Sequence, residues 1–137
     1  MVGILLLTHA PLGKAFIEAV THVFRAPTER FEAIDVNADQ DLAEVHALAQ
    51  AAIARLDAGS GVLVITDIKG GTPSNCCNSL ALALPGRVEV IAGISLPMLL
   101  RAITYRRDSL DVVVEMALAG AQSGAVRVDS RVRVGPE

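Results

Sequence analysis

The sequence predicts an α/β fold: a doubly wound open sheet with four parallel strands in the order 2-1-3-4, a C-terminal edge strand and helices on both faces. Three observations lead to this fold class. Apolar runs without polar alternation recur along the chain, segments with helical spacing of apolar residues separate them, and polar or glycine-rich loops follow two of the runs. A strand in such a sheet is apolar throughout, because helices cover both of its faces.

The composition fits one globular domain that spans residues 1–137. Apolar residues make up 52% of the chain and charged residues 20%, which is enough apolar surface for a substantial core. The formal net charge of -3 gives no reason to expect nucleic acid or an anionic membrane as a partner. The apolar N-terminal segment is too short to span a bilayer and lacks a basic flank, so we expect a cytoplasmic protein.

Strands and helices are expected to alternate along the chain. The expected strands cover residues 3–7, 31–36, 62–65 and 88–92. The expected helices carry apolar stripes over residues 12–24, 42–56, 76–84, a segment starting at 95–98, and 110–121. Residues with known positional preferences mark several ends. Asp41 and Glu44 resemble a capping box at a helix start, while Gly59 and Gly124 can end helices.

The last segment has a different pattern. Between residues 125 and 134 valine alternates with arginine, which is typical of a strand with one wet face. Such a strand belongs at a sheet edge or against another subunit, because an exposed edge would leave main-chain groups unpaired. We therefore expect residues 125–134 to form an edge strand in a homodimer.

A glycine loop follows the third expected strand, at residues 67–75. Gly70 and Gly71 allow a sharp turn and a close approach of main-chain N–H groups to a ligand. Thr72 followed by Pro73 fits a helix N-cap with proline at the first helical position. A helix start has unpaired N–H groups and a partial positive charge, so this loop is suited to bind a phosphoryl group.

A histidine and an aspartate end the first and third expected strands. These strands are neighbours in the predicted order, so His9 and Asp67 are expected to meet at the carboxyl edge of the sheet. Imidazole can carry a phosphoryl group on one nitrogen, while a carboxylate on the other nitrogen fixes its tautomer. The loop N–H groups and the Thr72 hydroxyl would then hold the phosphoryl oxygens. The residues expected to bind the phosphoryl group are Thr8, Gly70, Gly71 and Thr72.

Other polar residues are weaker candidates for a functional role. His22 and His46 lie off the apolar stripes of their helices and are expected to be solvated. Asp35 ends the second strand, where it is either a loop cap or part of a pocket. The neighbouring cysteines Cys76 and Cys77 lack any metal-ligand spacing, so we expect small buried side chains and no metal. The arginines near the fourth helix, at positions 101, 106 and 107, are expected at the surface.

These residues resemble the IIA component of the mannose-type sugar phosphotransferase system. The resemblance comprises the apolar strand ending in Thr8-His9, the glycine loop, and residues 93–99 after the fourth strand, and it covers nearly the whole chain. It implies that His9 accepts a phosphoryl group from the phosphocarrier protein HPr and passes it to a IIB component. It also implies that Asp67 lies beside His9, and that no metal or organic cofactor takes part.

Two departures from the family pattern lie at the expected rim of the site. Ala10-Pro11 stands where a glycine is usual after the histidine, and Ser95 replaces an asparagine found in many members. Together with Lys69, these residues are expected to face partner proteins or line the pocket rim. The departures affect the identity of the acceptor rather than the chemistry at His9.

Three other functions remain open from the sequence. The same carrier could act as a regulator without a dedicated transporter. The phosphotransfer subunit of dihydroxyacetone kinase shares the fold and an early histidine. A flavodoxin-like cofactor binder is compatible with the fold class, although only 3% of the residues are aromatic and few could stack on a flavin.

Overall fold

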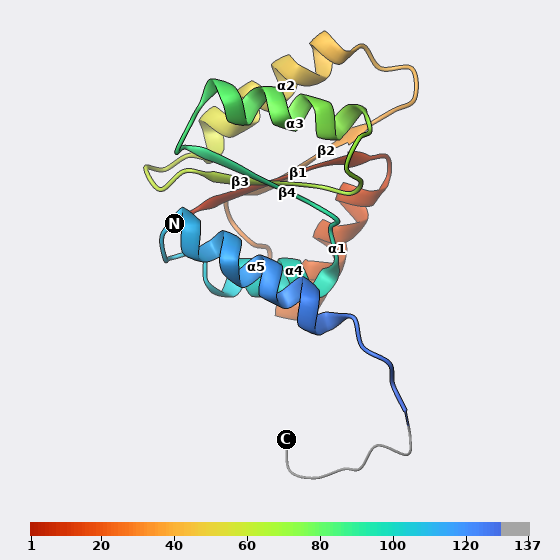
Figure 1. The fold of residues 1–137 in the computed structure, drawn as a ribbon, viewed down its shortest axis with the longest axis vertical. Coiled ribbons are helices and arrows are strands. Elements are labelled where there is room, and N and C mark those ends of the chain that lie inside the picture. Colours follow the sequence, from red (N-terminus) through yellow and green to blue (C-terminus); the bar gives the residue numbers. More distant parts are fainter. Residues whose placement is uncertain (130–137) are drawn as a thin grey trace.

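Four parallel strands form the centre of the fold, in a computed structural model that describes residues 1–129 (Figure 1). The strands are β1 (Gly3–His9), β2 (Phe31–Val36), β3 (Val62–Thr66) and β4 (Val88–Ala92). Their order is β2-β1-β3-β4, and every neighbouring pair is parallel. The predicted strand order is therefore confirmed. From β1 the chain adds β2 on one side, and β3 and then β4 on the other side.

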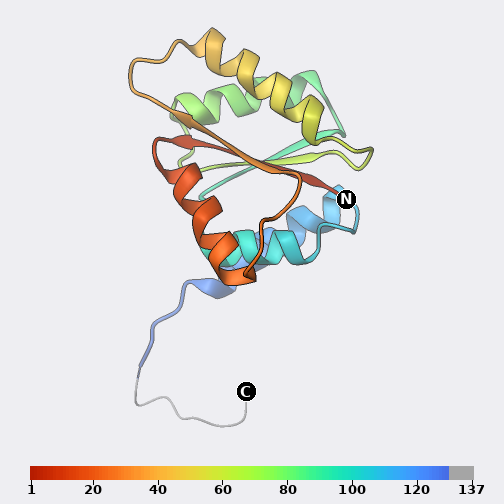
Figure 2. The same cartoon turned by 180° about the vertical axis from the view of Figure 1, so that it is seen from behind.

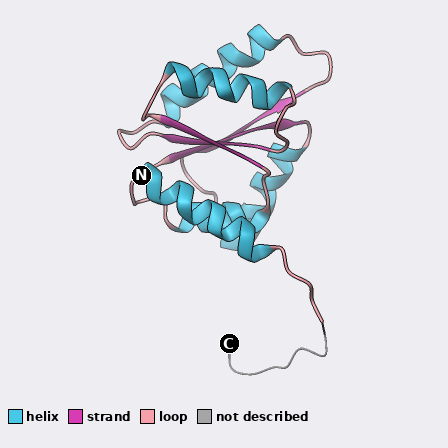
Figure 3. Ribbon diagram, viewed as in Figure 1, coloured by secondary structure: helices cyan, strands magenta, loops and turns pink. Residues whose placement is uncertain are grey.

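Helices cover both faces of this sheet (Figure 3). Helices α2 (Leu42–Leu56) and α3 (Thr72–Ala83) lie on one face. The other face carries α1 (Leu12–Phe24), α4 (Leu96–Thr104) and α5 (Leu110–Gly124). No helix within residues 1–129 is long and apolar enough to cross a membrane.

The alternating side chains of β1 divide the core into two parts. Ile4 and Leu6 belong to the cluster packed under α1, α4 and α5, whereas Leu5 and Leu7 belong to the cluster under α2 and α3. All four are fully buried. Burial of each such side chain stabilises the fold by about 1.5–3 kcal/mol, which explains why this strand is apolar throughout.

The helix starts agree only in part with the sequence prediction. Asp41 caps α2 by accepting a hydrogen bond from the N–H of Ala43, but Glu44 accepts from the side chain of Gln40 and does not complete a capping box. Thr72 is not the N-cap of α3: the helix begins at Thr72, and Gly71 is the cap residue. Gly71 is extended, so helical geometry starts one residue earlier than predicted.

The chain leaves the domain after α5. This helix ends at Gly124, as predicted, and residues 125–129 extend away from the sheet without regular structure (Figures 1 and 2). The remainder of the predicted edge strand, residues 130–134, lies outside the described residues. Within residues 1–129 the sheet has four strands with β2 and β4 at its edges, so the fifth strand stays a prediction.

Arg106 does not belong to a surface group of arginines as the sequence indicated, because its side chain is buried. Its guanidinium donates to the carbonyl oxygens of Val2, Glu29 and Arg30 at distances of 2.6–3.1 Å. Burial lowers the pKa of Arg106. The side chain thus ties the loop between α4 and α5 to the amino ends of β1 and β2, at the opposite edge from His9.

Candidate functional site

His9 and Asp67 meet at the carboxyl edge of the sheet. β1 pairs directly with β3, so the last residue of β1 lies beside the residue that follows β3. Oδ2 of Asp67 is 2.9 Å from Nδ1 of the imidazole, and it also accepts the main-chain N–H of His9 at 3.1 Å. The structure therefore brings together the two residues that the strand order predicts to meet.

The Asp67 carboxylate is held in its ionised form. Its side chain is only 6% exposed, and Oδ1 accepts hydrogen bonds from the N–H of Ile68 and the hydroxyl of Thr66. Burial raises the pKa of Asp67, but the hydrogen bonds from the imidazole and main chain of His9 outweigh it, so the pKa lies below its ordinary value. Because an ionised carboxylate only accepts, the hydrogen of a neutral imidazole is assigned to Nδ1, which leaves the lone pair on Nε2.

The glycine loop brings the start of α3 against the imidazole ring. A Cβ atom on Gly71 would lie 3.1 Å from Cε1 and 3.5 Å from Nε2 of His9, so only glycine lets the main chain pass without pushing on the ring. Gly70 has φ +97°, which other residues rarely adopt. The first N–H groups of α3 have no intrahelical acceptor, and no side chain caps them. An anion bound at Nε2 would face these donors.

Most of the other predicted site residues are exposed. Thr72, Gly70 and Lys69 are exposed on the loop, and Ala10 and Pro11 are exposed directly after His9. The imidazole itself is 46% exposed, so its free nitrogen is open to a partner. Ser95 is the N-cap of α4, and its hydroxyl accepts the N–H of Met98.

The side chain of Thr8 lies outside the site. The residue is fully buried, and its hydroxyl has no hydrogen-bond partner among the described residues. Side chains of a strand alternate between faces, so Thr8 points toward α1 while His9 follows Leu7 toward the α2 and α3 side. The structure therefore does not bring the Thr8 hydroxyl to the place where a phosphoryl group would enter.

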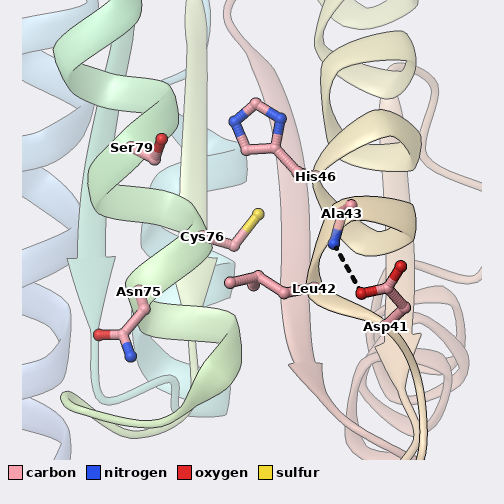
Figure 4. Close-up of a pocket in the computed structure, with 7 residues that line it drawn as sticks. All are labelled: Asp41, Leu42, Ala43, His46, Asn75, Cys76 and Ser79. Carbon is pink, nitrogen blue, oxygen red and sulfur yellow. Dashed lines mark hydrogen bonds between the residues drawn. The ribbon is translucent and has the colours of Figure 1, made fainter.

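His46 is half-buried rather than solvated as the sequence indicated. It points into a groove of about 500 Å³ between α2 and α3, facing the thiol of Cys76 (Figure 4). The other residues lining the groove are Asp41, Leu42, Ala43, Asn75 and Ser79. The spacing of apolar residues in α2 and in α3 does not reveal which polar side chains lie against the other helix. The groove between these two helices was therefore not predictable from the sequence.

The chemistry open to the cysteines is limited by burial, which raises the pKa of the Cys76 thiol and brings that of Cys77 to about 12. Both therefore remain neutral thiols near neutral pH. Within residues 1–129 no group of three or more histidine, cysteine, aspartate or glutamate side chains is arranged to hold a metal ion.

The fold and the site together define a doubly wound α/β domain with an imidazole and a glycine loop at its switch point. A family described as "PTS system fructose IIA component" matches residues 3–118. The chain belongs to this mannose-type IIA family of the sugar phosphotransferase system, as the resemblance predicted.

Related sequences agree with this family. The sorbose-specific EIIA component of Lacticaseibacillus casei is 34% identical over 99 residues, which are 71% of this chain and 68% of that protein. The mannose-specific EIIAB component of Escherichia coli K12 is 36% identical over 76 residues, 54% of this chain. The matched part spans only 23% of that longer relative.

Solved structures show the same fold at lower identity. The phosphotransferase system component EIIA from Streptococcus agalactiae superimposes with a TM-score of 0.84 at 22% identity, covering 93% of this chain and 97% of that one. The mannose/sorbose-specific IIA subunit from Enterococcus faecalis gives a TM-score of 0.83 at 21% identity, with coverages of 97% and 98%.

Proposed function

We propose that this protein is a phosphocarrier that accepts a phosphoryl group from phosphorylated HPr on Nε2 of His9 and passes it to a IIB component. The observation that carries the proposal is the 2.9 Å contact between Nδ1 of His9 and the buried carboxylate of Asp67. It leaves Nε2 as the nucleophilic nitrogen and turns it toward the uncapped start of α3.

The transfer needs no external base. The lone pair of Nε2 attacks phosphorus while the bond between phosphorus and the donor nitrogen breaks, and that electron pair returns to the donor imidazole. The Nδ1–H stays in place and donates to Asp67, whose negative charge offsets the positive charge that develops on the ring. Transfer to the acceptor is the same exchange in the opposite direction.

The phosphoryl oxygens would be held by the loop and the start of α3. The main-chain N–H groups after Gly70 and Gly71 and the hydroxyl of Thr72 provide donors on the side where Nε2 is open. Such donors, fixed before the reaction, stabilise the charge of the transferring group without reorganisation. The proposed chemistry uses these groups without a metal or organic cofactor.

The surroundings of His9 support docking of protein partners in the cytoplasm. Ala10, Pro11 and Lys69 are exposed around the imidazole, and Lys69 adds a positive charge.

A homodimer is part of the proposal, with residues 125–134 as an edge strand of one domain comprising residues 1–137. The exposure of Val126 and Val128, at 70% and 93%, supports a covering partner for this segment.

The proposal is tested by phosphorylation with radiolabelled phosphoenolpyruvate, enzyme I and HPr. The wild type is expected to become labelled through an acid-labile, alkali-stable linkage, and His9→Ala is not. His22→Ala is the matched control, because His22 is exposed on α1 away from the loop and should be dispensable. Label retained by His9→Ala would refute the assignment. Loss of the label on addition of a IIB component would support IIB as the phosphoryl acceptor.

A further inference from the structure

Two fully buried threonines lie at the carboxyl ends of neighbouring strands, and their hydroxyls differ in what they contact. Thr8 precedes His9 in β1, and Thr66 ends β3 directly before Asp67. The hydroxyl of Thr8 has no hydrogen-bond partner among residues 1–129, whereas that of Thr66 donates to Oδ1 of Asp67 at 3.4 Å. Transfer through His9 uses the Asp67 carboxylate, so a hydroxyl bonded to its other oxygen bears on the same chemistry.

The pleat of β3 turns Thr66 toward the side of the sheet where the imidazole lies. Val64 belongs to the cluster under α2 and α3, so Thr66, two residues further on, faces the same side. By the same alternation in β1, the imidazole of His9 lies on this side and Thr8 on the other. The Thr66 hydroxyl, the Asp67 carboxylate and the imidazole therefore form one chain of contacts.

The sheet fixes the main chain of Thr66. Its register partner in β4 is Ala92, and its carbonyl oxygen accepts the N–H groups of Gly93 at 2.9 Å and Ile94 at 3.2 Å. Because the residue is fully buried, water does not compete for its hydroxyl. The donor to Asp67 is thus held in place before any partner protein binds.

The Asp67 carboxylate has two donors on each oxygen. Oδ2 accepts the Nδ1–H and the main-chain N–H of His9, and Oδ1 accepts the N–H of Ile68 at 3.0 Å and the Thr66 hydroxyl. Three of the four donors remain if the hydroxyl is lost, so the carboxylate keeps its orientation. Its basicity changes instead, because a donor on Oδ1 stabilises the charged carboxylate and makes it a weaker base toward the imidazole hydrogen.

The basicity of this carboxylate bears on how tightly His9 retains a phosphoryl group. Once Nε2 carries the group and Nδ1 keeps its hydrogen, the ring has a positive charge, as protonated imidazole does. A more basic carboxylate stabilises that ring and favours the phosphorylated form. A less basic carboxylate favours release of the phosphoryl group to the next acceptor.

We propose that Thr66 is a positioning residue that acts on phosphotransfer through Asp67. Its hydroxyl moderates the basicity of the carboxylate, and this sets the equilibrium between the phosphorylated and free forms of His9. The inference rests on the proposed function, because it concerns the same histidine. It adds a third group to the pair and gives the buried hydroxyl a part in the energetics of the phosphorylated state.

Four forms of position 66 separate the hydroxyl from the methyl group. The wild type has both, Thr66→Val lacks the hydroxyl, Thr66→Ser lacks the methyl, and Thr66→Ala lacks both. Thr8→Val is the matched control, because it makes the same change in a fully buried threonine of the neighbouring strand, on the face away from the imidazole. Two quantities are measured: the equilibrium constant for phosphoryl exchange with HPr, and the pH midpoint of the His9 titration by NMR.

Both quantities should follow the hydroxyl and not the methyl group. In Thr66→Val and Thr66→Ala the exchange equilibrium shifts about threefold to tenfold toward the phosphorylated protein, as expected for the loss of one long hydrogen bond to a charged group. The midpoint of the His9 titration rises by about 0.5 to 1 pH unit, because a factor of ten corresponds to one unit. Thr66→Ser and Thr8→Val keep the wild-type values of both.

A wild-type value of either quantity in Thr66→Val would overturn the proposal, and so would equal values in Thr66→Ser and Thr66→Ala. If Thr66→Val does not fold, the comparison of Thr66→Ser with Thr66→Ala makes the same test, because these two variants differ only in the hydroxyl. The titration needs no phosphoryl group. A wild type that is never labelled would therefore refute the proposed function, while the midpoints would still decide whether Thr66 acts on the imidazole through Asp67.

Discussion

Replacing Asp67 with asparagine tests the polar arrangement behind His9 most sharply. The substitution preserves the shape of a side chain that is 6% exposed, so the fold should persist. The carboxylate accepts from four donors: the Nδ1–H and N–H of His9 through Oδ2, and the N–H of Ile68 and the hydroxyl of Thr66 through Oδ1. An amide has one acceptor oxygen, so it cannot serve both sets.

The size of the effect follows from this count. With its NH₂ toward His9, the amide favours the tautomer that places hydrogen on Nε2 and removes the nucleophilic lone pair. With its NH₂ toward Ile68, it leaves a main-chain donor unsatisfied and still lacks the negative charge. Hydrogen bonds to a charged group contribute about 1.5–3 kcal/mol, so transfer should slow by roughly tenfold to more than a hundredfold.

The assay is rapid-quench or stopped-flow transfer from phosphorylated HPr to wild type and Asp67→Asn under single-turnover conditions. The slower rate should appear in the chemical step, because Asp67 lies behind the imidazole and away from docking partners. A rate equal to that of the wild type, in a variant with an unchanged circular dichroism spectrum, would remove Asp67 from the mechanism.

Four further predictions concern residues around the site and the chain end. Thr8→Val should raise the free energy of unfolding by about 1 kcal/mol in urea titrations and leave phosphotransfer intact, because it removes a buried hydroxyl without a partner; slower transfer would return Thr8 to the site. Gly71→Ala should slow labelling of His9, since the added methyl presses on the ring at 3.1 Å, and normal kinetics would contradict this contact. The lowered pKa of Asp67 contributes stability that is present above the unfolded pKa of about 3.9 and lost as pH falls through the folded pKa; acid titrations of stability should therefore be shallower for Asp67→Asn than for wild type. Deleting residues 125–137 should convert a dimer to a monomer in sedimentation equilibrium, and a monomeric full-length chain would refute the proposed homodimer.

The sheet and the meeting of His9 with Asp67 were predictable from local sequence features. Leu5, Leu6 and Leu7 lie in an uninterrupted apolar run because both faces of β1 are covered. The strand order then places the ends of β1 and β3 side by side, which is enough to bring the imidazole and the carboxylate together. The rule that ligands bind beyond the carboxyl ends of parallel strands is therefore enough to locate this pair from the sequence.

Features that depend on contacts between remote segments were not predictable in the same way. Arg106 is buried because three carbonyl oxygens from the starts of β1 and β2 converge on it, and no periodicity reveals that convergence. Asp35 accepts the N–H of Gly13 at the start of α1, and this contact depends on its register with Thr8 and on the space over Gly13. The predicted N-cap at Thr72 is one position off because the strand-to-helix turn is completed at Gly71.

Identifying the phosphorylated nitrogen tests directly whether His9 carries the phosphoryl group on Nε2. Nitrogen-15 and phosphorus NMR on the protein phosphorylated through enzyme I and HPr distinguish the two imidazole nitrogens and the three histidines. Because Asp67 holds Nδ1 at 2.9 Å, the phosphoryl group should be found on Nε2 of His9. A phosphoryl group on Nδ1 of His9, or on His22 or His46, would contradict transfer through Nε2 of His9.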